Sequence, residues 1–290
     1  LESNPAPVYL QAWGGGNTAA RAFFKLKTEH PDQYERAISK AVLYNIWYQD
    51  GAGNYIEQVH PGVTMLHCAS FNGTWNYRSQ TDTYEFIENE VKNNHGPLGA
   101  LYPQDYVSEG DSPAFLYSIG NGLRNHEHPS YGGWGGRFEK FETYEQVYVD
   151  AEDDGDDRQS LRRWVEDANR DFAARMDWCA ADEYKDANHP PTIKLKGNRD
   201  LSVSGGETIV LDARASSDPD GDDIQFEWLQ YTDAGSYEGL VDLQDSENAT
   251  ISFAAPRVTK PETIHMILKV SDRGSPVLAS YERIIINLVP

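Results

Sequence analysis

The chain is poor in basic residues and in long apolar runs, and both shortages exclude classes of protein. Its 290 residues include 25 Lys and Arg against 46 Asp and Glu, which gives a formal net charge of −21. Nucleic acids and anionic membrane surfaces bind clustered cations, so we expect neither as a partner. The sequence has no run of about 18 apolar residues and therefore predicts no membrane-spanning helix. The composition favours a soluble extracellular protein that acts on uncharged partners.

Cysteine is also scarce, since Cys68 and Cys179 are the only two in the chain. Neither belongs to a C-x-x-C pair, so a zinc ribbon or a redox motif is not supported. The two residues are compatible with a disulfide and equally with two buried thiols. Their spacing does not choose between these alternatives.

The chain changes its pattern at Asn188-His189-Pro190-Pro191, and we predict a domain boundary there. Before this point, an apolar strand, a glycine turn and an Ala-rich helix form the βα unit that builds parallel sheets. Beyond it, short segments with alternating apolar residues recur at regular intervals, which is typical of an immunoglobulin-like β-sandwich. We therefore expect an α/β domain over residues 1–187 and a sandwich over residues 188–290.

The periodicities also predict the individual elements. In the first domain we expect strands over residues 7–13, 41–48 and 63–69, and helices over residues 18–28, 32–40, 84–92 and 161–176. The last of these helices should pack on the first domain as its final element. In the sandwich we expect strands over residues 192–195, 208–211, 224–228, 250–253, 265–270 and 283–288.

The segment Trp13-Gly14-Gly15-Gly16-Asn17 directly follows the first predicted strand. Open α/β sheets bind ligands at the carboxyl ends of their strands, and glycines let a ligand approach the backbone. One interpretation is therefore substrate contact at Trp13 and Asn17. The other is a tight turn without a ligand, and the segment does not match the nucleotide-binding G-x-G-x-x-G pattern.

Two acidic segments can each be interpreted in two ways. Glu109 and Asp111 stand before Ser112-Pro113 and an apolar run, where two carboxylates can hold calcium or activate water. The alternative is an ordinary helix start, with Asp111 as the N-cap. The segment from Asp218 to Asp223 likewise predicts either a calcium-binding loop or a solvated turn.

The glycine-rich stretch over residues 125–138 is the most unusual in the chain. His126 and His128 could flank a metal, but no third ligand stands at a proper spacing, which disfavours zinc. Four glycines surround Trp134 and precede Arg137. This pattern predicts either a pocket lined by Trp134 and Arg137, or an Arg137 that anchors the acidic loops.

Five segments between residues 12 and 191 carry a resemblance to a known family. They are Ala12 to Thr18, Glu109 to Leu116, His128 to Phe138, Asp171 to Trp178 and Asp186 to Pro191. These segments resemble secreted cellulose-binding proteins that have a nucleoside hydrolase-like domain and an immunoglobulin-like C-terminal domain. The resemblance implies an α/β fold class, with the C-terminal part of a nucleoside hydrolase-like parallel-sheet domain followed by the β-sandwich.

The resemblance also implies a missing N-terminal half and a calcium cofactor. No segment here matches the D-x-D-x-x-x-D-D calcium cluster of nucleoside hydrolases, so we expect the missing half to be a partner that supplies most ligands. Asp111 corresponds to the late Asp that completes the calcium shell in those enzymes. The His that usually precedes it is replaced by Gly110, which departs from the pattern for N-glycosidic hydrolysis.

The leading functional hypothesis is a calcium-dependent glycosidic-bond hydrolase of the nucleoside hydrolase-like type, acting on plant or algal polysaccharide or its fragments. The residues expected to contact the substrate are Trp13, Asn17, Glu109, His128, Trp134 and Arg137. The alternative is a non-catalytic protein that binds cellulose or another polysaccharide. The sandwich would then be either a binding module, with contacts from exposed Trp228, Tyr231 or Tyr237, or only a spacer. Both hypotheses predict a polysaccharide or oligosaccharide partner and a secreted or periplasmic location.

Overall fold

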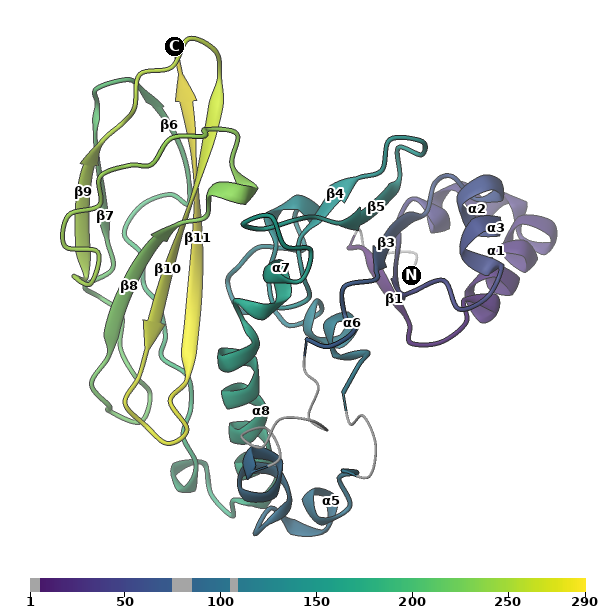
Figure 1. Ribbon diagram of the computed structural model, residues 1–290, viewed down its shortest axis with the longest axis horizontal. Helices are drawn as coiled ribbons and strands as arrows, with labels where there is room; N and C mark the ends of the chain where they lie inside the picture. The colour runs from purple at the N-terminus through teal and green to yellow at the C-terminus, as the bar shows by residue number, and fades with distance from the viewer. Residues whose placement is uncertain (1–5, 75–84, 105–108) are drawn as a thin grey trace. The chain divides into compact units, whose positions relative to one another are not determined.

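The computed structural model describes residues 6–74, 85–104 and 109–290 (Figure 1). The chain divides into two compact units, and each is described by itself. The first unit contains residues 1–76, 107–119 and 125–165, and the second contains residues 77–106, 120–124 and 166–290. The predicted sandwich therefore lies in the second unit together with other segments, and the domain boundary after residue 187 stays a prediction.

The first unit is built on a five-stranded sheet with the order β1-β2-β3-β5-β4. Neighbours among β1, β2, β3 and β5 pair in parallel, and β4 pairs antiparallel with β5. The strands are β1 (Val8–Ala12), β2 (Ala41–Ile46), β3 (Thr64–Cys68), β4 (Phe138–Lys140) and β5 (Val147–Asp150). The helices are α1 (Asn17–Glu29), α2 (Pro31–Ile38), α3 (Ala52–Val59), α6 (Ser112–Leu116), η2 (Pro129–Tyr131) and α7 (Gln159–Arg162). This architecture confirms the predicted α/β class.

A compact apolar core joins the sheet of the first unit to helices α1, α2 and α3. Five of the six side chains of β2 are buried, which is typical of a parallel strand covered on both faces. Each helix contributes apolar side chains at helical spacing. The largest contributors are Phe23, Tyr34, Ile38, Leu43, Ile56 and Met65.

Most predicted elements of this part are confirmed, and three differences are informative. The predicted strands and the first two helices correspond to β1, β2, β3, α1 and α2. The short strands β4 and β5 were not predicted. Residues 85–92 are helical and end in the π-helical turn η1 (Glu88–Lys92), whereas Tyr84 lies outside the described residues. The helix predicted over residues 161–176 is divided into α7 and α8 (Val165–Ala180).

The second unit contains two sheets that pack face to face around one apolar core. The larger sheet has the order β6-β11-β10-β8, and the smaller one pairs β7 with β9. The strands are β6 (Asp200–Ser204), β7 (Thr208–Asp212), β8 (Gln225–Gln230), β9 (Thr250–Ala254), β10 (Glu262–Ser271) and β11 (Ala279–Val289). The short helices are η1, α5 (Gly96–Ala100), η3 (Tyr184–Asp186) and η4 (Thr232–Ala234). Alternate residues of β7 and β9 point into the core, as a half-exposed strand requires.

The two central strands, β10 and β11, are buried on both faces. One face of each strand contributes apolar side chains to the sandwich core. The other face carries polar side chains, of which Arg283 is fully buried and donates through Nε to the Leu123 carbonyl at 2.6 Å. On the same face, the buried Asp167 of α8 accepts from Lys269 Nζ at 2.8 Å and from the Tyr281 hydroxyl. Helix α8, expected to pack on the first domain, therefore makes these contacts with the sandwich strands.

Several expectations for the second unit are corrected by burial. Trp228 and Tyr231, proposed as exposed sugar contacts, are buried, and Tyr237 packs against the sandwich core. The strand predicted over residues 192–195 is reduced to an isolated bridge between Thr192 and Ser217. Both cysteines are free thiols, with Cys68 buried in the first unit and Cys179 exposed in the second.

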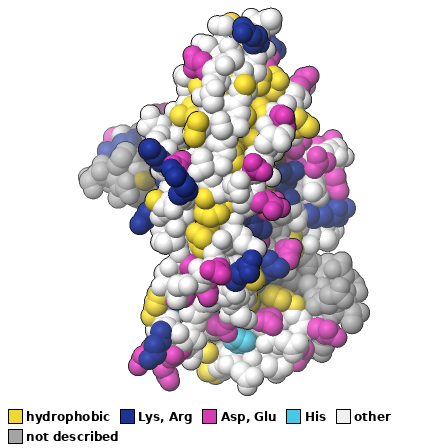
Figure 2. Space-filling view, turned by 90° about the vertical axis from the view of Figure 1, so that its left-hand side faces the viewer, with side chains coloured by type: hydrophobic (Ala, Val, Ile, Leu, Met, Phe, Trp, Pro, Cys, Tyr) yellow, Lys and Arg dark blue, Asp and Glu magenta, His cyan; other side chains and the backbone are white. Residues whose placement is uncertain are grey.

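The surface carries charge of both signs. On the face shown in Figure 2, Asp and Glu side chains are interspersed with small separate groups of Lys and Arg. Hydrophobic side chains on that face gather in patches between the charged groups. Over the described part of the chain, no helix combines the length and the apolar character that crossing a membrane requires.

The contacts of Asp167 generate a stability prediction. Replacing Asp167 with Ala removes the acceptor of both bonds and leaves the Lys269 ammonium without its buried partner. We expect the free energy of unfolding, measured by urea denaturation, to fall by about 3 kcal/mol.

The matched control is the neighbouring Glu166→Ala. Glu166 pairs with Arg170 on the exposed side of the same helix, so its loss should cost less than about 0.5 kcal/mol. Equal losses for the two variants would contradict the role assigned to Asp167.

Candidate functional site

Two exposed indoles lie at the edge of the sheet where the parallel strands end, which we call the carboxyl edge. Trp13 directly follows β1 and Trp47 directly follows β2, and these strands are neighbours paired in register at Ala12 and Asn45. Trp13 is 50% exposed and Trp47 is 53% exposed. Large aromatic side chains usually bury most of their area, so a pair this accessible at adjacent strand ends favours a ligand contact. We refer to Trp13 and Trp47 as the indole pair.

Hydrogen bonds hold the backbones of the indole pair together. The side-chain amide of Gln49 donates to the backbone carbonyl of Trp13 at 3.2 Å and to that of Ile46 at 3.1 Å. The indole of Trp13 donates to Gln11 Oε1 at 3.0 Å. One side chain thus ties the ends of β1 and β2, which restricts the positions of both indoles before any ligand binds.

Trp47 is also held in an uncommon backbone conformation. Its φ of 57° lies in the left-handed region, which bulky residues rarely occupy because of steric cost. The Trp47 amide donates to the Cys68 carbonyl at 3.0 Å, and its ring meets Phe71 edge to face with centroids 6.4 Å apart. The aromatic surface therefore continues from β2 to the end of β3. Trp47 was not predicted as a site residue, because residues 41–48 predict an ordinary strand.

The glycine turn after β1 is shaped by Asp50. The Asp50 carboxylate accepts from the backbone amides of Asn17, at 3.2 Å, and Ala52, at 2.8 Å. A Cβ at Gly15 would overlap this carboxylate, so the turn needs glycine there for its own packing. Asn17 begins α1 at this edge, and its contact with substrate stays a prediction.

The loop that contains Glu109 and Asp111 lies near the carboxyl edge, because Gly110 between them is close to Phe71. Gly110, between them, lies close enough that an added Cβ would stand 4.0 Å from the Phe71 ring. The Ser112 hydroxyl donates to Glu109, and Asp111 precedes α6 without donating or accepting a side-chain cap bond. Burial raises the pKa of the Asp111 carboxyl above its usual value, and the neighbouring Glu109 carboxylate raises it further. A carboxyl with a raised pKa suits proton transfer or a hydrogen bond to a hydroxyl.

The carboxylates at this edge do not by themselves make a calcium shell. Calcium takes six to eight oxygen ligands, usually from several carboxylates. Across residues 6–74, 85–104 and 109–290, no group of three or more His, Cys, Asp or Glu side chains is arranged to hold an ion. The predicted metal role of Asp111 therefore stays a prediction that requires ligands from elsewhere.

Asp150 is the last residue of β5 and therefore also lies at the carboxyl edge. One of its oxygens accepts from the amides of Ala69 and Ser70, at 2.6 and 2.7 Å. Burial raises the pKa of the Asp150 carboxyl, although these two bonds oppose the rise. Asp150 thus orients the segment that leads from β3 to Phe71. Asp150 was not predicted as a site residue, because the four-residue β5 carries no clear alternation.

The predicted site residues Trp134 and Arg137 of the glycine-rich stretch are buried, unlike the exposed indole pair. Trp134 is only 3% exposed, and Arg137 is buried. Arg137 Nε donates to Asp153 at 2.6 Å, and Arg163 contacts the same carboxylate at 3.1 Å. This geometry supports the second interpretation of Arg137, an anchor for the acidic loop after β5. Substrate contact by Trp134 and Arg137 stays a prediction.

His128 is occupied by local hydrogen bonds. Its Nδ1 accepts from the Ser130 amide at 3.2 Å and lies 2.7 Å from the Ser130 hydroxyl. Burial lowers the pKa of the imidazole, which keeps it neutral at neutral pH. His128 therefore caps the helix η2, and its predicted substrate contact is untested.

Comparison with known proteins identifies relatives of both parts of the chain. Residues 1–138 match the family model of the cellulose-binding Sde182, nucleoside hydrolase-like domain. Residues 208–288 match the model of the cellulose-binding protein Sde0182, C-terminal domain. No curated protein matches the chain.

One solved structure is similar over almost the whole chain. It is a nucleoside hydrolase-related hypothetical protein from Saccharophagus degradans that is associated with carbohydrate metabolism. The two are 33% identical with a TM-score of 0.86, over 99% of this chain and 72% of the other. Extracellular cadherin domains of protocadherin gamma B2 match 34% of this chain and 24% of theirs, at 19% identity and a TM-score of 0.22, which supports no inference. The chain thus belongs to the Sde182 family, with its nucleoside hydrolase-like domain and its C-terminal domain.

Proposed function

We propose that this chain binds cellulose or a chemically similar polysaccharide through the indole pair, without needing to cleave it. The observation that carries the proposal is the exposure of Trp13 and Trp47 at the ends of adjacent strands. The less polar face of a pyranose ring packs against an aromatic ring, so exposed indoles are suitable contacts for sugars. Support also comes from the family, whose models are described as cellulose-binding.

The spacing of the indole pair suits an extended chain of sugars. Adjacent strands lie roughly 4.8 Å apart, so the two indoles leave the backbone at neighbouring points. Phe71 extends the aromatic surface from Trp47 toward the loop of Glu109 and Asp111. A glucan segment only a few units long would contact rings and then reach carboxylates that accept hydrogen bonds from its hydroxyls.

The charge and the rigidity of this edge agree with a neutral, extended ligand. A protein with a net charge of −21 repels anionic partners but not an uncharged glucan. Gln49 and Asp50 fix the turns that carry the indole pair, which reduces the entropy lost on binding. Because such polysaccharides lie outside cells, the proposal places the protein in a secreted or periplasmic compartment.

Removal of the indole pair tests this proposal. The double variant Trp13→Ala, Trp47→Ala should weaken retention of the full chain on microcrystalline cellulose. An aromatic contact is worth about 1 kcal/mol, so loss of two should raise the apparent Kd by roughly 30-fold.

The control is Phe141→Ala, which removes another exposed aromatic. Phe141 follows β4 at the opposite edge of the same sheet, where β5 begins, and it should leave retention unchanged. Equal retention of the double variant and the unaltered chain would refute the proposal.

A second candidate function is calcium-dependent hydrolysis of a glycosidic bond, and one observation favours it. Asp111 combines a raised pKa with a neighbouring Glu109 carboxylate, as a general acid or base would require. Calcium, when bound, would orient and acidify a water molecule. Under this proposal Asp111 supplies one ligand, and a preceding segment of the parent protein supplies the others.

Calorimetry tests the metal role of Asp111. In the full-length parent protein, Asp111→Ala should reduce calcium affinity by at least about tenfold, because one charged ligand is lost. Asp111→Asn, which keeps the shape of the side chain, should bind calcium with intermediate affinity. Unchanged affinity in the Ala variant would exclude Asp111 as a ligand.

A further inference from the structure

The second unit presents a column of stacked flat groups that the site described above does not use. The rings of Tyr184 and His189 lie 3.5 Å apart with an interplanar angle of 4°. His189 is also parallel to the Trp178 indole, at 5.5 Å and 7°, and the Arg175 guanidinium lies 5.3 Å from that indole. We call these four side chains the stacked column.

The end of the stacked column is open to solvent. Tyr184 is 63% exposed, although the contact with His189 covers one face of its ring. The exposed area must therefore include the opposite face. A tyrosine that served only to close a core would be buried with its hydroxyl bonded. Tyr184 instead presents a flat apolar face outward.

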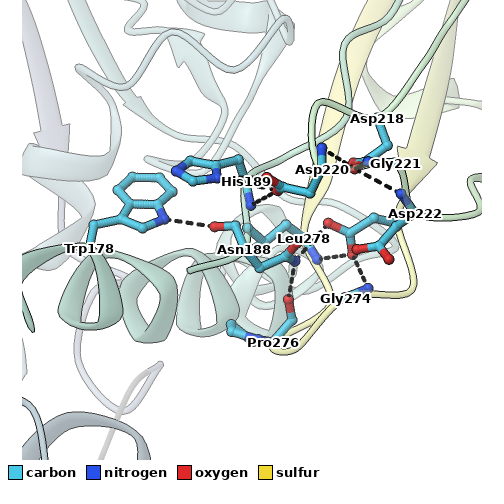
Figure 3. Close-up of polar contacts among 11 residues, drawn as sticks. Trp178, Asn188, His189, Asp218, Asp220, Gly221, Asp222, Gly274, Pro276 and Leu278 are labelled. Atoms are coloured by element: carbon cyan, nitrogen blue, oxygen red, sulfur yellow. Dashed lines mark hydrogen bonds and ion pairs between the residues drawn. The ribbon is translucent and has the colours of Figure 1, made fainter. Parts of the chain in front are cut away.

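Hydrogen bonds fix two members of the stacked column, Trp178 and His189, as Figure 3 shows. The backbone amide of His189 donates to Asp220 at 2.7 Å, and its ring lies 3.2 Å from the same carboxylate. The Trp178 indole donates to the Asn188 carbonyl at 2.7 Å. The Asn188 amide then donates to the buried Asp272 at 2.9 Å. The rings of His189 and Trp178 thus have fixed supports, and His189 is the surface on which the outward ring of Tyr184 stacks.

The acidic loop over residues 218–223 contributes to this support. One carboxylate oxygen of Asp218 accepts from the amides of Asp220, Gly221 and Asp222, at 2.8, 3.0 and 3.2 Å (Figure 3). These bonds close a tight turn and direct Asp220 toward His189. Of the two interpretations of this segment, the geometry favours a turn that holds the stacked column.

Charged residues flank Tyr184 in the sequence. Glu183 and Lys185 form an exposed ion pair at 2.7 Å, and Glu183 and Asp186 cap the helix η3 that carries Tyr184. Sugar hydroxyls both donate and accept hydrogen bonds, so carboxylates and an ammonium on the residues next to an aromatic side chain suit them. The combination of an exposed ring with adjacent charged residues distinguishes this segment from a plain hydrophobic patch.

We propose that Tyr184 is a second sugar-stacking surface, which binds a pyranose ring of a glucan independently of the indole pair. This inference rests on the proposed function, because it assumes the same class of ligand. Two contacts on one chain would increase retention on a polymer that offers many identical units. The rival explanation is that Tyr184 only covers His189.

The test compares two variants of Tyr184 in the full chain. Tyr184→Leu keeps an apolar cover over His189 but has no flat ring, whereas Tyr184→Phe keeps the ring. Retention on microcrystalline cellulose is measured for both, also in the background of Trp13→Ala, Trp47→Ala. We expect the Leu variant to raise the apparent Kd by about threefold to tenfold in either background, and the Phe variant to match its parent.

The outcomes separate this inference from the proposed function. If the Leu variant binds like its parent while the indole pair variant is weakened, Tyr184 only covers His189 and the inference is overturned. If the unaltered chain is not retained on cellulose, the proposed function fails and this inference fails with it. Thermal unfolding checks that each variant is folded.

A measurement on the unaltered chain covers the case of an unfolded Leu variant. The NMR signals of the Tyr184 ring should shift when cellohexaose is added, because a sugar stacks on the ring. Ring signals that stay unchanged at saturating cellohexaose would overturn the inference.

Discussion

Parallel pairing of β1, β2, β3 and β5 is the constraint on which the proposed site depends. Strands paired in parallel end on the same side of a sheet, so the segments that follow them are brought to one edge. This is why Trp13 and Trp47, more than thirty residues apart in the sequence, become neighbours. The same pairing brings Phe71 and Asp150 to that edge, and Gly110 packs there against Phe71.

The supports of this edge are polar, and the surfaces that they present are aromatic. The side chain of Gln49 donates to backbone carbonyls, and those of Asp50 and Asp150 accept from backbone amides. These bonds hold three loops in fixed positions. The rings of Trp13 and Trp47 remain accessible. The second unit repeats this division of roles, since Asp220 and Asn188 hold the column that exposes Tyr184. In each unit, rigid polar contacts position an aromatic side chain that contributes little to its own core.

The sequence predicted the framework well and the site only in part. Strands β1 to β3 were predictable because their apolar runs are bounded by glycine and polar turns, and Trp13 followed from its place after β1. The strands β4 and β5 are too short for a periodic signal, so Asp150 was missed. Trp47 was placed inside the strand predicted over residues 41–48, because apolar periodicity carries no signal for its left-handed backbone conformation.

Burial explains the remaining differences, because tertiary packing decides which aromatic rings face water. The glycines around Trp134 suggested a pocket lined by its indole, and the ring is buried. Trp228 and Tyr231 of the sandwich are likewise buried, whereas Tyr184 is exposed. The local sequence around an aromatic residue is similar whether its ring is buried or exposed. Sequence alone therefore does not distinguish a core ring from a stacking surface.

Indole footprinting tests the central claim most directly. The unaltered chain is oxidised with N-bromosuccinimide, with and without saturating cellohexaose, and each indole is followed by mass spectrometry. The account predicts that Trp13 and Trp47 react in the free protein and are protected by the sugar, while the buried Trp134, Trp164 and Trp228 stay unreactive in both samples. Oxidation of Trp13 and Trp47 at the same rate with and without cellohexaose would contradict it.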